Sequence, residues 1–114
     1  MITTVVNLRD EPYDIYIGRP TKWGNPFTLK DGTRQQIIEA YKQYLYRRPE
    51  LMKQAHLELH GKILGCYCKP HACHGDILAR IANMSWDEFE ALEERLAIQQ
   101  ADNVYPLGEV EEYV

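Results

Sequence analysis

One short stretch, Gly65 to Gly75, constrains the fold of this chain most, because it carries all three cysteines and two of the four histidines. An apolar pair, Ile63 and Leu64, leads into it, and apolar residues at helical spacing follow from Ile77 onward. This pattern predicts a strand, a tight turn and then a helix, with the thiols and imidazoles at the junction. Ligands of open α/β folds bind where strands end and helices begin, so we expect chemistry in this stretch.

The remaining patterns predict the other elements of an α/β domain. Residues 3–8 and 13–17 indicate two strands, which we expect to pair as a hairpin, and residues 62–68 indicate a third, central strand. Start signals and helical spacing indicate helices at 33–46, 49–60, 74–82 and from 85 onward. We therefore predict a central sheet of three or four strands with helices on both faces, in three layers, and an extra C-terminal helix.

Length and composition bound the class of protein. The 114 residues suffice for one core, which we place at residues 1–100, followed by an acidic tail at 101–114. No stretch approaches the roughly 20 apolar residues that span a bilayer, so we predict no membrane partner. The first residues show no signal peptide, and three is an odd number of cysteines for a disulfide framework. Both observations favour a cytoplasmic protein with reduced thiols.

The net charge of −4 hides an asymmetry. Residues 1–84 carry 12 Lys and Arg against 8 Asp and Glu, whereas residues 85–114 carry one Arg against 9 acidic residues. A mildly basic core favours an anionic partner, such as a nucleotide, a phosphate or nucleic acid. The alternative is a solvated acidic helix beside a domain of ordinary charge.

A loop rich in glycine and proline, residues 18–27, separates the second strand from the first helix. It carries residue types that bind anions and bases: Arg19, Lys22, Trp23 and Asn25. In one interpretation the polar residues of this loop face a ligand. In the other, the loop is a rigid surface segment whose Trp23 and Phe27 fill the core, and the two interpretations are compatible.

The cysteine–histidine stretch allows a reactive or anion-handling site. Cys73 or Cys66 would be the nucleophile or polar contact, and His74 would exchange protons with it. A thiol at the start of a helix is favoured as thiolate, and free amides there would hold a phosphate. Asp76 would orient His74. No cofactor is expected in this interpretation.

Two other interpretations of the same stretch remain open. Cys66, Cys68 and Cys73, with His74 or His71, supply three thiolates and one imidazole, a set suited to tetrahedral zinc. Alternatively, the cysteines are small buried residues beside a capping histidine. The other two histidines, His56 and His60, lie four residues apart on the second helix without the glutamate of an H-E-x-x-H motif, so we predict them to be surface residues.

The segments Tyr16 to Phe27 and Gly65 to Asp76 together resemble an uncharacterised family of phages and bacteria, domain of unknown function 4326, with both motifs in order. The resemblance spans roughly residues 3–83. It implies a small Rossmann-like α/β domain and a phage origin, hence the host cytoplasm, but no established activity. The strand and Cys-His helix start are also similar to domain of unknown function 488. An arginine usually follows the Cys-His pair there, where Gly75 stands here.

The sequence therefore favours a small enzyme or binding domain that acts on a nucleotide, a nucleobase or a nucleic-acid end. Basic and amide side chains of the loop would hold the anionic part, with Trp23 beside it, and the reacting part would be lined by Cys66, Cys73 and His74. One alternative is a zinc-stabilised interaction module without catalysis. A second is a phage protein that binds a host protein through its acidic tail.

Overall fold

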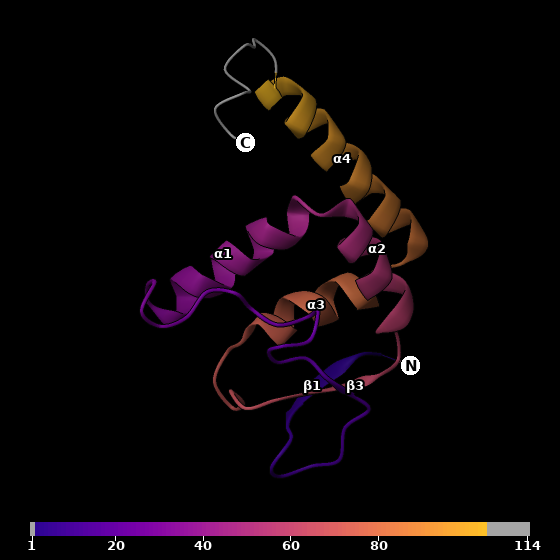
Figure 1. The fold of residues 1–114 in the computed structure, drawn as a ribbon. Coiled ribbons are helices and arrows are strands. Elements are labelled where there is room, and N and C mark those ends of the chain that lie inside the picture. Colours follow the sequence, from indigo (N-terminus) through magenta and orange to yellow (C-terminus); the bar gives the residue numbers. More distant parts are fainter. Residues whose placement is uncertain (1, 105–114) are drawn as a thin grey trace. The chain divides into compact units, whose positions relative to one another are not determined.

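A computed structural model of the chain describes the backbone of residues 2–104 and the side chains of residues 2–100 (Figure 1). The chain divides into two compact units, residues 1–84 and residues 85–114. Among the described residues, no helix has the length and apolar character that crossing a membrane requires.

The first unit contains a parallel sheet of three short strands. They are β1 (Thr4–Asn7), β2 (Ile15–Tyr16) and β3 (Ile63–Cys66), in the order β1-β3-β2. The third strand is central, as predicted, but the predicted hairpin is wrong, because β1 and β2 both pair with β3 in parallel. Burial explains the order: residues 64–66 of β3 are buried, whereas β1 and β2 are at most half-buried. The most apolar strand therefore takes the central position.

Three helices lie on one side of this sheet, namely α1 (Arg34–Tyr46), α2 (Pro49–Glu58) and α3 (His74–Asn83) (Figure 1). Helix α3 packs on β1 and β3, and the other two helices pack on α3. The sequence signals mark their first residues correctly. Thr33 and Gln36 form the expected capping box at α1, and Pro49 occupies the first turn of α2.

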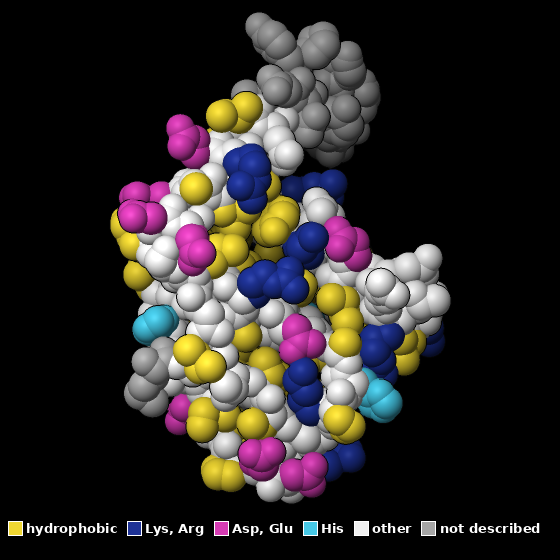
Figure 2. Space-filling model, turned by 180° about the vertical axis from the view of Figure 1, so that it is seen from behind, with side chains coloured by type: hydrophobic (Ala, Val, Ile, Leu, Met, Phe, Trp, Pro, Cys, Tyr) yellow, Lys and Arg dark blue, Asp and Glu magenta, His cyan; other side chains and the backbone are white. Residues whose placement is uncertain are grey.

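The opposite face of the sheet carries no helix in the described part of the first unit, so the prediction of helices on both faces is wrong there. The connection between β1 and β2 crosses this face instead, and the Tyr13 ring lies directly on Gly65, where a Cβ atom would approach it to 2.7 Å. The glycine permits this close contact. The connection is acidic, with Asp10, Glu11 and Asp14 exposed, and Figure 2 shows acidic side chains at the lower end of the molecule.

The second unit contains α4 (Trp86–Val104). Its start has the predicted capping box: Ser85 Oγ accepts from the Glu88 amide at 3.1 Å, and Glu88 Oε1 accepts from the Ser85 amide at 2.8 Å. The predicted acidic tail at 101–114 begins within this helix, and its remaining residues lie outside the described part of the chain.

His56 of α2 and His60, two residues beyond the end of that helix, cap the end of α3. His56 Nδ1 donates to the Ile81 carbonyl and His60 Nδ1 to the Ala82 carbonyl, each at 3.0 Å, because a carbonyl oxygen can only accept. These carbonyls belong to the last turn of α3, where backbone acceptors lack intrahelical partners. His60 is exposed, as predicted, but the prediction is wrong for His56, which is buried.

Buried Thr3 joins the first strand to the ends of two helices. Its hydroxyl donates to the Leu59 carbonyl at 2.6 Å and accepts from the Gly61 amide at 2.9 Å. Gly61 has φ of 75°, the left-handed conformation that ends a helix and favours glycine. The backbone of Thr3 also forms two hydrogen bonds with the Asn83 side chain, at 2.7 and 3.0 Å.

We expect Thr3→Val to lower the free energy of unfolding by about 1–3 kcal/mol, because it leaves the Gly61 amide and the Leu59 carbonyl without this hydroxyl. Thr4→Val, at the exposed start of β1, is the matched control and should stay within about 0.5 kcal/mol of the wild type. Urea unfolding monitored by circular dichroism measures both. Equal losses in the two variants would contradict this role of Thr3.

Candidate functional site

A cavity of about 510 Å³ lies between the loop of residues 18–27, here the Gly/Pro loop, and residues 66–74, here the cysteine–histidine turn. Its wall is formed by residues of three segments: the end of β2 and the loop after it, the first half of α1, and the turn from β3 into α3. Arg19 and Asn25 thus share one cavity with Cys66, Cys73 and His74, more than 40 residues later in the chain.

The Gly/Pro loop is held in place by its buried tryptophan. Trp23 is 4% exposed, and its carbonyl accepts a hydrogen bond of 2.6 Å from the hydroxyl of buried Tyr41 in α1. Asn25 closes the loop further, since its side chain accepts from the Phe27 amide at 2.9 Å and donates to the Ile37 carbonyl at 3.4 Å. Trp23 is therefore a buried core residue, as one of the two interpretations of the loop expects.

Of the predicted ligand-binding residues, Arg19 and Asn25 line the cavity. Lys22 and Trp23 do not. The Lys22 ammonium pairs with Glu58 at 3.1 Å and lies 4.8 Å from the centre of the Trp23 ring. A cavity-lining residue that the sequence did not single out is Arg34, whose guanidinium donates to the Ala72 carbonyl at 3.3 Å.

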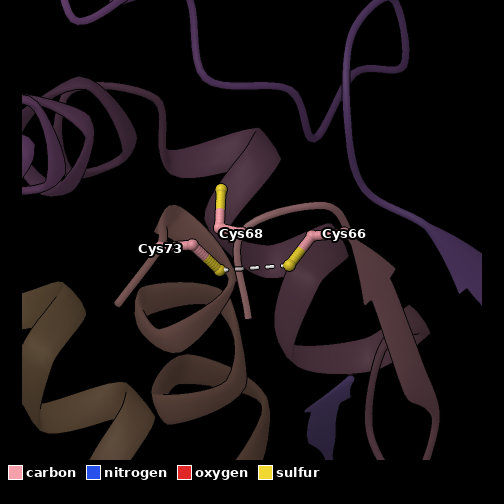
Figure 3. A group of neighbouring side chains, drawn as sticks. All are labelled: Cys66, Cys68 and Cys73. Atoms are coloured by element: carbon pink, nitrogen blue, oxygen red, sulfur yellow. Dashed lines mark hydrogen bonds between the residues drawn. The ribbon is translucent and has the colours of Figure 1, made fainter. Parts of the chain in front are cut away.

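The three cysteines meet where β3 turns toward α3. The sulfurs of Cys66 and Cys73 lie 3.4 Å apart and face each other (Figure 3), and the three Sγ atoms all lie within 4.8 Å of one another. Cys66 and Cys73 are buried and Cys68 is half-buried. This arrangement is close enough to hold a metal ion.

The Cys66 and Cys73 sulfurs are joined by one hydrogen bond, in which either sulfur can be the donor. The hydrogen bond from the Cys73 thiol lowers the pKa of Cys66 to about 6; burial opposes this, and backbone N–H groups of Cys68 and Lys69 reinforce it. The same hydrogen bond, together with burial, raises the pKa of Cys73. The contact therefore favours one thiolate in the pair, because the neighbouring thiol donates a hydrogen bond to it.

His74 joins the two segments of the site. Its Nε2 donates to the Ile17 carbonyl at 2.8 Å, and its ring meets the Tyr41 ring edge-on with centres 5.0 Å apart. Burial lowers the pKa of His74, the hydrogen bond to Ile17 opposes this, and nearby Arg19 lowers it further. The imidazole is therefore neutral near pH 7, with its hydrogen on Nε2.

Asp76 hydrogen-bonds to Lys69 and Cys73, not to His74 as predicted. Its carboxylate pairs with the Lys69 ammonium at 2.7 Å and accepts from the Cys73 amide at 3.1 Å. Burial lowers the pKa of Lys69, but the hydrogen bond and the charge of Asp76, together with the nearby Cys73 and Cys66, outweigh it, so the pKa is raised. The amides of Gly75 and Asp76, expected to hold a phosphate, donate to the sulfur and the carbonyl of Cys73 instead.

Comparison with known proteins places the chain in a family. Residues 3–84 match the model of the domain of unknown function DUF4326, so the chain belongs to this family, and the resemblance noted in the sequence is confirmed. A relative from Enterobacteria phage T4, described as an uncharacterized 12.4 kDa protein in the nrdA-td intergenic region, is 43% identical over 90 residues. The alignment covers 75% of this chain and 83% of the relative. No solved structure matches the chain.

Burial lowers the pKa of His74, so the imidazole binds a proton more readily in the unfolded chain than in the folded protein. The free energy of unfolding should therefore fall as the pH drops through the unfolded value of 6.5. His74→Gln keeps an N–H donor for the Ile17 carbonyl but does not titrate, so its stability should fall less over this range. Urea unfolding between about pH 7.5 and 5.5 compares the two slopes. Identical slopes would contradict a neutral, buried His74.

Proposed function

We propose that the protein binds an anionic ligand of the nucleotide class in the cavity between the Gly/Pro loop and the cysteine–histidine turn. One observation carries the proposal: two arginines, Arg19 and Arg34, line the cavity, and no acidic residue of the described part of the chain does. Among the described residues, neither arginine forms an ion pair with a carboxylate. Guanidinium groups without acidic partners are suited to phosphate oxygens, which they bind in bidentate geometry.

The rest of the cavity wall is suited to a nucleobase. Tyr16, Phe27 and Tyr67 bring aromatic rings to the cavity, and Ile37 and Ile38 of α1 add apolar surface. Aromatic and apolar side chains stack on or cover a nucleobase whatever its identity. The volume of about 510 Å³ falls within the range of small-molecule sites. A ligand with a phosphate at one end and a planar ring at the other matches both parts of this wall.

The cysteines and His74 give the cavity a reactive wall as well. Cys66 presents a sulfur, and the Nε2–H tautomer of His74 leaves Nδ1 as its acceptor nitrogen. A nucleophile and a proton acceptor on one wall are the groups that covalent processing of a bound nucleotide or nucleic-acid end requires. We propose binding as the function and place any turnover at this wall.

A zinc-stabilised interaction module is the second candidate. The convergence of three Sγ atoms within 4.8 Å favours it. The predicted fourth ligand, His74, does not belong to this cluster of ligand atoms, and its Nε2 donates to the Ile17 carbonyl. This candidate predicts a metal-bound protein that binds no nucleotide.

Arg19→Ala should weaken nucleotide binding about 10- to 100-fold, as expected when one charge-assisted hydrogen bond of about 1.5–3 kcal/mol is lost. Isothermal titration calorimetry with nucleoside mono-, di- and triphosphates, nucleosides and inorganic phosphate identifies the class that binds. Lys22→Ala is the matched control, because it removes the same charge from the same loop but outside the cavity. It should bind like the wild type.

Two results would overturn the proposal. The first is that no member of this panel binds the wild-type protein. The second is that Arg19→Ala and Lys22→Ala lose the same affinity, since general electrostatic attraction rather than the cavity would then explain binding.

A further inference from the structure

We propose that Cys66, Cys68 and Cys73 together bind one zinc ion and leave its fourth coordination position open toward the cavity. Zinc binding by the three thiolates goes beyond the proposed function and does not depend on it. Only the further step, that an atom of the bound anion occupies the fourth position, rests on the nucleotide proposal.

The sulfurs are nearly at the spacing that zinc requires. Tetrahedral zinc with Zn–S bonds of about 2.3 Å places its sulfurs roughly 3.8 Å apart. The Cys66 and Cys73 sulfurs lie 3.4 Å apart, and no pair of the three exceeds 4.8 Å. In Figure 3 the Cys68 sulfur lies off the line between the other two. Cys68 is only half-buried, so its side chain is the one of the three with room to adjust when a metal binds.

A backbone amide already points at one of the sulfurs. The Gly75 amide donates to the Cys73 sulfur at 3.3 Å, and the Cys73 sulfur in turn lies 3.4 Å from that of Cys66. A hydrogen bond from an amide stabilises a thiolate and orients a metal ligand. The polar contacts of these sulfurs therefore fit a metal site as well as a packed core.

The surroundings also balance the charge. Three thiolates and one Zn²⁺ carry a net charge of −1. The Lys69 ammonium interacts electrostatically with both Cys66 and Cys73. Two further positive charges, Arg19 and Arg34, line the same cavity. The ion pair from Lys69 to Asp76 connects the turn of Cys68 to the first turn of α3, which Cys73 caps.

The protein supplies only three ligands in this geometry. Among the described residues, no histidine, aspartate or glutamate joins the three cysteines. His74 Nε2 donates to the Ile17 carbonyl and the Asp76 carboxylate pairs with Lys69, and neither residue belongs to the cluster. All three cysteines line the cavity, so the remaining position faces space that a water molecule or a ligand atom can fill. Three protein ligands with one exchangeable ligand are typical of zinc sites that act on a bound molecule, rather than of structural ones.

The first test measures metal content. The full chain is supplied with zinc under reducing conditions, freed of excess metal and analysed by mass spectrometry of the elements. We expect one zinc per chain in the wild type and a loss of at least about tenfold in affinity in Cys68→Ser, whose half-buried position spares the fold. His71→Ala, in the same turn but outside the cluster, is the matched control and should keep its zinc. Wild-type protein without stoichiometric zinc overturns the proposal.

The second test examines the fourth position with cobalt(II) in place of zinc. Sulfur-to-cobalt charge-transfer absorption should fall by about one third in Cys68→Ser, and added azide should change the visible bands as it enters the open position. Bands that do not respond to azide, or that change in His71→Ala, overturn the open position. Neither test uses a nucleotide, so the titration of Arg19→Ala succeeds or fails independently of them.

Discussion

The site depends on one buried hydrogen bond, from His74 Nε2 to the carbonyl of Ile17, at 2.8 Å. Ile17 follows β2 and opens the Gly/Pro loop, whereas His74 begins α3, and 57 positions of sequence separate them. The Tyr41 ring packs against the imidazole, and its hydroxyl holds the Trp23 carbonyl of the same loop. An unpaired carbonyl or imidazole at this depth would be costly, so the two segments are held against each other. This contact joins two of the segments that line the cavity.

Local signals in the sequence were enough to predict where elements begin, but not how they pair. The capping boxes at Thr33 and Ser85 are confirmed, because each depends on residues only three apart. Alternation in residues 13–17 indicated a strand but carried no direction, so the parallel pairing with β3 was missed. The sheet face covered by Tyr13 was missed too. The sequence does not show that Tyr13, rather than a helix, packs on this face, because its contact with Gly65 joins residues far apart in the chain.

The site was predictable as a pair of segments but not as a set of side-chain roles. Charge and glycine content singled out the loop of Arg19, and cysteine spacing singled out the turn. The type of a residue does not determine where its side chain points. Lys22 pairs with Glu58 outside the cavity, whereas Arg34 lines its wall. At the sequence level Arg34 was simply the first residue of a helix. The three sulfurs meet although Cys68 lies beyond the end of β3, so the period of the strand does not explain their convergence.

The residue that begins α3 has an unusual chemistry for its position. Helices usually start on an oxygen-bearing side chain, but here the Cys73 sulfur accepts the Gly75 amide, and Asp76 completes the box. The same sulfur belongs to the cluster at the cavity wall. Any atom that bonds to it therefore competes with, or reinforces, the first backbone contact of the helix. Occupancy of the site and fraying of α3 are thus linked equilibria, and amide hydrogen exchange in that first turn reports on both.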